Sequence, residues 1–182
     1  MKSLCLHVLD ILQNSVKAHT KMVELIIKDS IKDNKYIFTV KDDGIGINNE
    51  NIQSVTDPFF TTSLDKKIGL GLSLVQMDCR RAGGDLCICS TKGLGSDITF
   101  WFNHNSIDRQ PLGDIANIVA DFAASNKNIR LVYTHITDKG SFVFDSLAAK
   151  QALAVSSLNN NKIVQALKQM IDNNLTDIYY NQ

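Results

Sequence analysis

Apolar residues recur along this chain with the periods of helices and strands. Over residues 3–19 they form one helical stripe, made by Cys5, Val8, Leu9, Leu12 and Val16. The next two segments, MVELIIKDSI and KYIFTVKDDG, are rich in β-branched and aromatic residues and are separated by KDN. This pattern predicts a helix followed by a hairpin of two antiparallel strands.

The middle of the chain is less regular before the periodic pattern returns. NNENIQSV predicts a short helix, and residues 57–70 predict a long irregular segment. Residues 70–82 predict a second long helix, which the pair Gly83-Gly84 ends. GDLCICST and SDITFWFN then predict two more strands, joined by the turn KGLG.

A change in the pattern near residue 105 predicts a second unit. HNSIDRQPLGD places a proline within a polar stretch, which is typical of a linker. Beyond it, residues 112–125 and 160–173 predict helices, and NIRLVYTHI and GSFVFDSL predict a hairpin. We expect one domain over residues 1–104 and a small α/β domain over residues 105–182, packed on the first because about 75 residues are marginal alone.

Composition narrows the class of protein. The 182 residues include 19 basic and 19 acidic side chains, so no net charge favours nucleic acid. No apolar run approaches the roughly 20 residues that cross a bilayer, and the N-terminal stretch lacks the cleavage site of a signal peptide. We therefore expect a cytoplasmic protein with no nucleic-acid or membrane partner.

Four cysteines do not suggest a disulfide framework in a chain of this length, which agrees with a reducing cytoplasm. Cys87 and Cys89 form a C-x-C pair in an alternating segment, so period two places both thiols on one face of a sheet. We expect two small buried residues there, because a metal or redox role would need further ligands.

One face of the first helix combines a carboxylate, an amide and an amine. Asp10, Asn14 and Lys17 follow one another at i, i+4 and i+7. An amide oxygen is a hard ligand that suits Mg²⁺, so such a row can hold a metal ion and phosphates. Taken alone, the same row is also typical of a solvated helix face.

The stretch KDDGIG ends a predicted strand with two carboxylates and two glycines. Gly44 and Gly46 permit positive φ and the close approach of a flat ligand. A carboxylate there could accept a hydrogen bond from an adenine amino group. A turn that simply ends the strand has the same composition, so this stretch alone does not decide between them.

The stretch KKIGLGLSLV combines positive charge with a helix start. Gly69 and Gly71 expose backbone N–H groups where the helix dipole favours phosphate, and Lys66 and Lys67 add charge. Neither the P-loop motif nor the dinucleotide fingerprint is present. An ordinary helix start is the alternative for this stretch alone.

In this order and spacing, the three stretches together resemble the GHKL ATPases: gyrase-type ATPases, heat-shock-90-type chaperones, histidine kinases and mismatch-repair ATPases. DILQNSVKA resembles the N box of that superfamily, DDGIGI its first glycine box, DPFF its phenylalanine box and KKIGLGLSLV its second glycine box. GLGSDITF resembles the closing segment, with Ser96 where Thr is usual. The resemblance covers residues 4–102.

The resemblance implies an α+β fold, a two-layer α/β sandwich with a mixed sheet, helices on one face, and ATP between the helices and a flexible lid. It implies that Asn14 holds Mg²⁺ against the phosphates, Lys17 contacts phosphate and Asp42 binds the adenine amino group. The other residues implied in ATP binding shape the adenine floor, the lid and the phosphate contacts: Gly44, Gly46, Phe59, Phe60, Lys66, Lys67, Gly69, Leu70, Gly71, Leu72 and Ser96.

Asp10 departs from the family pattern at the position of the general base. The resemblance implies Glu there in members that hydrolyse ATP and in anti-sigma serine kinases, and Asn in histidine kinases. Asp has the charge of Glu but is shorter by one CH₂, so it reaches a water or hydroxyl less easily unless a second water intervenes. Asp10 is therefore a candidate base of reduced reach.

Autophosphorylation in cis is not expected, because no histidine lies in an H-E-x-x-x-P pattern and no phosphoacceptor helix precedes the N box. We expect structural or exposed roles for His7, His19, His104 and His135. The chain resembles small stand-alone bacterial ATP-binding proteins described as histidine-kinase-like or anti-sigma-like.

Three functions stay open on this basis. The first is a regulatory kinase that phosphorylates a partner protein in trans, and it is the one we expect. The second is a slow ATPase whose nucleotide state gates a protein contact, and the third is a nucleotide-binding protein without turnover. The second unit would then bind the partner, or pair with a second copy of the chain as a homodimer.

Overall fold

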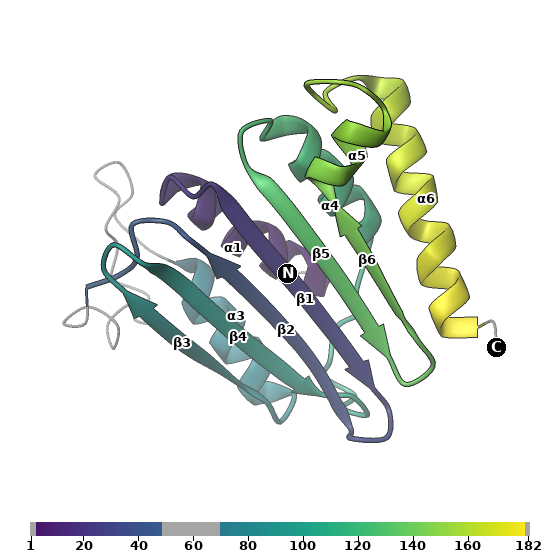
Figure 1. The fold of residues 1–182 in the computed structure, drawn as a ribbon. Coiled ribbons are helices and arrows are strands. Elements are labelled where there is room, and N and C mark those ends of the chain that lie inside the picture. Colours follow the sequence, from purple (N-terminus) through teal and green to yellow (C-terminus); the bar gives the residue numbers. More distant parts are fainter. Residues whose placement is uncertain (1–2, 49–69, 181–182) are drawn as a thin grey trace.

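In the computed structural model of the protein, residues 3–48 and 70–180 are described. They form a six-stranded mixed sheet in the order β3-β4-β2-β1-β5-β6 (Figure 1). Neighbouring strands are antiparallel except β1 and β5, which run parallel. The strands are β1 (Met22–Ser30), β2 (Lys35–Asp42), β3 (Asp85–Thr91), β4 (Gly95–Asn103), β5 (Arg130–Thr137) and β6 (Ser141–Asp145).

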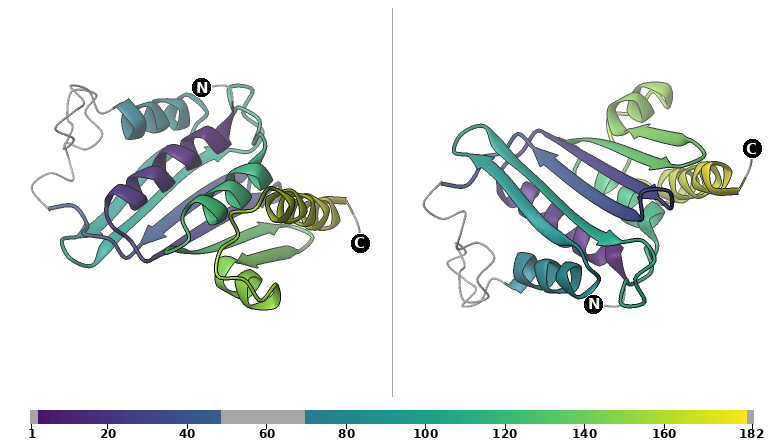
Figure 2. Two further views of the ribbon diagram at one scale, coloured as in Figure 1. Left: turned by 90° about the horizontal axis from the view of Figure 1, so that it is seen from above. Right: turned by 90° about the horizontal axis from the view of Figure 1, so that it is seen from below.

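The long helices lie on one face of the sheet, and no described helix covers the other face (Figures 1 and 2). Along β1, for example, Val23, Leu25 and Ile27 are fully buried while the residues between them are partly exposed. The two-layer sandwich implied by the sequence is therefore confirmed. The helices are α1 (Leu4–Lys17), α3 (Leu70–Arg81), α4 (Ile115–Ser125), the short α5 (Ser146–Ala152) and α6 (Asn161–Tyr180).

Backbone contacts with the segment after β4 satisfy the first N–H groups of α1. Leu4 N donates to the carbonyl of Pro111 at 2.9 Å, and Cys5 N donates to that of Leu112 at 2.8 Å. These N–H groups have no partner within a helix, so the segment after β4 supplies the cap that the side chain of Ser3 does not. The segment predicted as a linker is thus fastened to the start of the chain.

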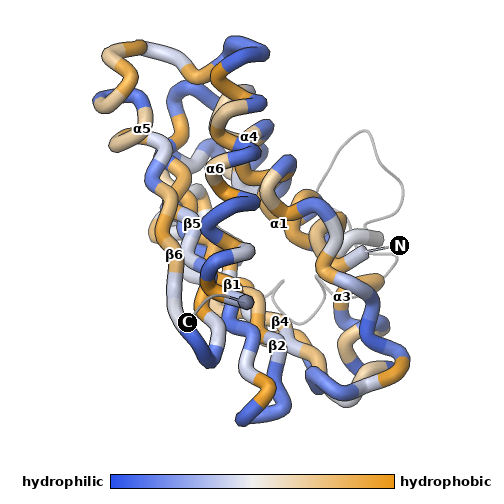
Figure 3. Tube along the Cα trace, turned by 90° about the vertical axis from the view of Figure 1, so that its right-hand side faces the viewer, coloured by the Kyte–Doolittle hydropathy of each residue, from blue (hydrophilic) through white to orange (hydrophobic). Residues whose placement is uncertain are grey.

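One continuous core fills the space between the layers. Phe38 and Phe100 stack with ring centroids 4.8 Å apart, and Phe102 meets both rings edge-on. In Figure 3, hydrophobic positions gather along the strands and helices, whereas the turns β1–β2 and β5–β6 are mostly hydrophilic. The buried residues of both predicted units belong to this single cluster.

The separate small domain expected over residues 105–182 is not confirmed. β5 pairs with β1 along its whole length, residues 22–29 with residues 130–137, so β5 and β6 extend the first sheet. Leu131 and Tyr133 are fully buried beside Val23 and Leu25. A polar stretch with a proline looks like a domain linker, but here it only carries the chain from one part of the sheet to another.

Most predicted elements are confirmed, with differences in the last third of the chain. The final helix is longer than expected, and α5 was not expected as an element. Asp145 ends β6 and caps α5, because its carboxylate accepts from Leu147 N at 2.9 Å. Apart from Asn48 and Leu70, the short helix expected from NNENIQSV and the irregular segment 57–70 lie outside the described residues.

Candidate nucleotide-binding site

The carboxylate of Asp42 stands where β2 ends beside α1. Its Oδ2 accepts from Ser15 Oγ of α1 at 2.9 Å, and its Oδ1 accepts from Gly44 N at 3.0 Å. Ser96 lies directly opposite in the β2–β4 register. Asp42 is half-buried, so its carboxylate is oriented by the protein and still open to a ligand. Ser15 was not identified from the sequence, although it lies within DILQNSVKA, because its partner Asp42 is 27 residues away along the chain.

Both glycines of the predicted adenine floor are also required by packing. A Cβ on Gly44 would lie 2.7 Å from the carbonyl oxygen of Ala18, at the end of α1. Gly46 has a φ of +65°, and its Cβ would lie 2.2 Å from the carbonyl oxygen of Thr91. The loop after β2 therefore runs in backbone contact with α1 on one side and with the β3–β4 turn on the other.

A row of hydroxyl groups connects this loop with the β3–β4 hairpin. Ser90 Oγ lies 3.0 Å from Ser96 Oγ, donates to the carbonyl of Gly95 at 2.8 Å and accepts from Ile47 N at 2.8 Å. Gly95 has a φ of +105°, and a Cβ there would lie 1.8 Å from the carbonyl oxygen of Asp42. Ser90 and Gly95 were not singled out from the sequence, although Gly95 lies within GLGSDITF.

Asp43 has a different role from its neighbour. Its Oδ1 accepts from Thr20 Oγ1, from Lys21 N at 2.7 Å and from Met22 N at 2.9 Å. Burial acts to raise the pKa of Asp43, but these hydrogen bonds outweigh burial and hold it below its usual range. Asp43 thus fastens the loop between α1 and β1.

The polar row of α1 differs in exposure along the helix, and its last member also borders α4. Asp10 is half-buried and Asn14 is exposed, one turn apart. Their carboxylate and amide oxygens are the donors that a hard cation such as Mg²⁺ prefers, so these residues fit the implied ion. Lys17 is exposed and also lines a groove of about 410 Å³ between α1 and α4.

Among the described residues, nothing packs against the backbone at the start of α3. No described atom lies within 4 Å of a Cβ placed on Gly71, whereas Leu72 packs against the core. Leu70 is the first residue of the helix. The other members of this predicted stretch lie outside the described residues: Phe59, Phe60, Lys66, Lys67 and Gly69.

A buried hydrogen bond between His7 and Asp78 fastens α3 to α1. His7 Nε2 lies 3.1 Å from Asp78 Oδ2, which also accepts from Gln110 Nε2 at 3.2 Å. Burial is the main cause that lowers the pKa of His7, against the attraction of Asp78. His7 is fully buried, which agrees with the structural role expected for it. The two residues are far apart in the sequence, and no motif joins them.

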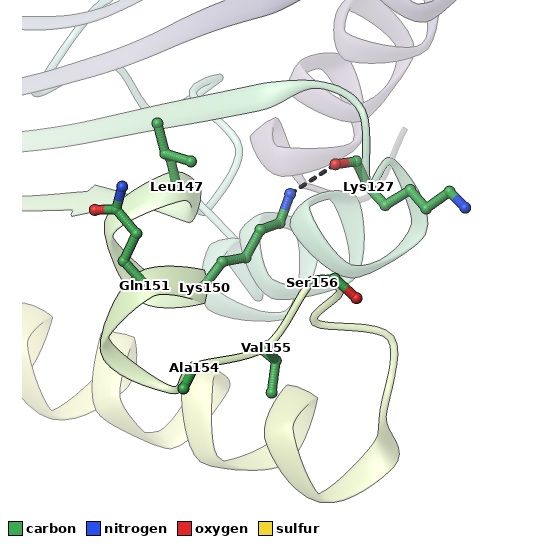
Figure 4. A pocket seen from close by; sticks show the side chains of 7 residues that line it. All are labelled: Lys127, Leu147, Lys150, Gln151, Ala154, Val155 and Ser156. Carbon is green, nitrogen blue, oxygen red and sulfur yellow. Dashed lines mark hydrogen bonds between the residues drawn. The ribbon is translucent and has the colours of Figure 1, made fainter.

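A second hollow, of about 460 Å³, lies beside α5 (Figure 4). Lys150 Nζ donates there to the backbone carbonyl of Lys127 at 2.7 Å, so its ammonium group is already engaged. No acidic or thiol side chain lines this hollow. Ser156 supplies the hydroxyl group of its lining, and no carboxylate stands beside it as a general base.

A helical layer over a mixed sheet, with an oriented carboxylate at the end of β2 and a polar row on the first helix, defines an ATP-binding domain of the GHKL type. Residues 2–106 match the family model of histidine kinase-, DNA gyrase B- and HSP90-like ATPases. The match covers more than half of the chain, and the protein belongs to this family.

Curated relatives with significant similarity include sensor histidine kinases. The sensor histidine kinase ZraS of Salmonella typhimurium is 37% identical over 67 residues, which cover 37% of this chain and 14% of ZraS. The peroxide stress-activated histidine kinase mak2 of Schizosaccharomyces pombe is 36% identical over 74 residues, 38% of this chain and 3% of mak2. The chain thus spans only a small part of the length of these relatives.

Solved structures show the same fold at low sequence identity. The N-terminal domain of a DNA repair protein superposes with a TM-score of 0.58 and 18% identity, over 79% of this chain and 52% of that one. The MutL ATPase domain of Aquifex aeolicus, complexed with ADP, superposes with a TM-score of 0.54 and 12% identity. That superposition covers 85% of this chain and 70% of the MutL domain chain. Both superpositions cover more than residues 2–106, so the shared fold includes part of the last third.

Proposed function

We propose that the chain binds Mg-ATP between α1, the end of β2 and the start of α3, and acts as a regulatory kinase on a partner protein. The observation that carries the adenine part is the carboxylate of Asp42, held by Ser15 and Gly44 N and still half-exposed. A carboxylate accepts a hydrogen bond from the amino group of adenine. Guanine has a carbonyl oxygen in the equivalent place, which a carboxylate rejects.

The polar row of α1 supports the phosphate part. Asp10 and Asn14 present oxygen donors on one face, and the start of α3 presents backbone N–H groups that no described residue packs against. Bound Mg²⁺ would neutralise part of the phosphate charge. Asn14 and Asp10 are the residues that we propose to hold it, and Lys17 the one that we propose to contact phosphate.

The proposed kinase activity rests on Asp10 and on the similarity to sensor histidine kinases. A carboxylate on α1 can accept the proton of an attacking hydroxyl, which is the work of a general base. The named relatives are histidine kinases, and the small C-terminal segment, which lies beyond the family match, is where we place the partner contact. A slow ATPase that acts as a nucleotide switch is the second candidate, because Asp10 has a shorter side chain than Glu.

One experiment separates these functions. The full chain is incubated with Mg-ATP labelled at the γ-phosphate, with and without a soluble extract of its native cell. Label on a second protein supports the kinase, and release of free phosphate by the chain alone supports the ATPase. Calorimetry without any detectable binding of ATP would contradict both.

A further inference from the structure

Cys87 and Cys89 do not lie in the core as their C-x-C pattern was expected to place them. Both thiols are free and exposed on β3, which among the described strands lies at the edge of the sheet and pairs with β4 alone. Period two does place them on one face, but Leu86 and Ile88, which alternate with them, pack against the core. The larger apolar side chains occupy the buried face of β3, so the cysteines point to the side of the sheet that no described helix covers.

The geometry of β3 excludes a relaxed disulfide between the two cysteines. Residues i and i+2 of a strand are about 6.7 Å apart, and their parallel Cβ atoms keep about the same spacing. A disulfide needs Cβ atoms about 3.8 Å apart. β3 pairs with β4 from Asp85 to Thr91, and this ladder holds the strand extended. The two side chains can lean toward one another, but the extended backbone keeps their Cβ atoms too far apart for a relaxed disulfide.

We propose that Cys87 and Cys89 form a two-thiolate site for a soft monovalent metal cation of the copper(I) class. A metal–sulfur bond is about 2.3 Å long, so a cation between two sulfurs separates them by about 4.6 Å. Side chains that leave the strand about 6.7 Å apart reach that separation by leaning together. Thiolates are the ligands that select copper(I) over harder cations.

The surroundings favour two-fold coordination over a tetrahedral zinc site. Cys89 lies opposite Asp97, whose carboxylate is engaged by Lys41 Nζ at 3.3 Å. Cys87 lies opposite Thr99, whose hydroxyl contacts that of Thr39 at 3.0 Å. Within the described residues, no group of three or more His, Cys, Asp or Glu side chains has metal-binding geometry. Among the described residues, zinc would therefore find two of its four ligands.

Metal capture by the pair requires no oxidant. Two thiols and one monovalent cation give a bis-thiolate complex and two free protons, and no electron is transferred.

The test uses the full, reduced chain without oxygen. Copper(I) is supplied as its complex with bicinchoninate, and transfer to the protein is followed by loss of that colour. We expect one copper(I) per chain and two protons released per metal. Cys87→Ser and Cys89→Ser should each lower the affinity by about 10²–10⁴-fold, because the second thiolate acts at high effective concentration. Cys5→Ala removes a buried thiol and should leave the copper(I) affinity unchanged.

Three outcomes would overturn the site. The first is a wild-type chain that does not withdraw copper(I) from the chelator. The second is either serine variant, shown by circular dichroism to be folded, with wild-type affinity, since binding would then be adventitious and rest on one thiol. The third is rapid formation of a Cys87–Cys89 disulfide with diamide. The site shares no residue with the proposed nucleotide site, so loss of ATP binding would leave it standing.

Discussion

The adjacent carboxylates Asp42 and Asp43 leave the same strand end but face different partners. Asp43 accepts three hydrogen bonds from the loop between α1 and β1. Asp42 accepts one from Ser15 and one from Gly44 N, and stays half-exposed. The sequence identified the pair but showed no partner for either, because those partners come from α1 and from the chain after it.

Asp42→Asn should lower the affinity for ATP by about 10–100-fold, since a hydrogen bond to a charged group contributes about 1.5–3 kcal/mol. It should also bring the affinities for ATP and GTP closer together. Calorimetry with both nucleotides measures this. Asp43→Asn is the matched control, which should lower the melting temperature and keep the ATP-to-GTP ratio. A wild-type protein that binds GTP as well as ATP would contradict the adenine role.

Asn14→Ala should reduce the Mg²⁺-dependent part of ATP affinity by at least about 10-fold, because loss of groups that support a bound metal has effects of that size. Asn14 is exposed on a helix, so the free energy of unfolding should stay the same or rise slightly. Gln13→Ala removes the adjacent exposed amide and serves as control. Equal affinities for the Asn14 variant and wild type, with and without Mg²⁺, would remove Asn14 from the site.

A buried chain of hydrogen bonds joins β5, α6 and β1. Tyr133 Oη lies 2.6 Å from His135 Nδ1, His135 Nε2 lies 2.9 Å from Tyr179 Oη, and Tyr179 Oη donates to Asp29 Oδ2 at 2.8 Å. A neutral imidazole with its proton on Nε2 satisfies every partner in this order. Burial lowers the pKa of His135 to about 4, so the folded protein keeps it neutral.

Stability should therefore fall as the pH is lowered from about 6.5 to about 4. In that range the unfolded chain takes up a proton at His135 and the folded protein does not, so the stabilisation present above pH 6.5 is lost progressively. The difference of pKa corresponds to roughly 3 kcal/mol. Urea unfolding at several pH values measures the slope, which His135→Gln should flatten. His19→Asn, at an exposed histidine, should leave it unchanged.

The types of the elements could be predicted because periodicity is a local property of the sequence, whereas the tertiary contacts between elements could not. The apolar stripe of α1 and the alternation in β1 and β2 can be recognised directly in the sequence. By contrast, the parallel pairing of β1 with β5 joins segments about a hundred residues apart, and the sequence of neither strand identifies the other as its partner. The same holds for His7 and Asp78. For Cys87 and Cys89, the period predicted a shared face, but the choice of face depended on the larger Leu86 and Ile88.

The continuous sheet and core predict one cooperative unit from residues that look like two domains in the sequence. Leu131 is fully buried on β5, opposite Val23 of β1. Leu131→Ala should destabilise the protein by about 2–5 kcal/mol, through lost burial and the cavity that remains. Val132→Ala, on the partly exposed face of the same strand, should cost about 1 kcal/mol or less.

The single tryptophan, Trp101, shows whether that loss spreads through the molecule. It lies on β4, separated from β5 by β2 and β1. If the sheet unfolds as one unit, Leu131→Ala should lower the midpoint of Trp101 fluorescence and that of far-ultraviolet circular dichroism by the same amount. Two separate transitions, with the Trp101 midpoint unchanged, would show instead that residues 1–104 fold independently. Shared strand pairing and a shared core predict a single shift.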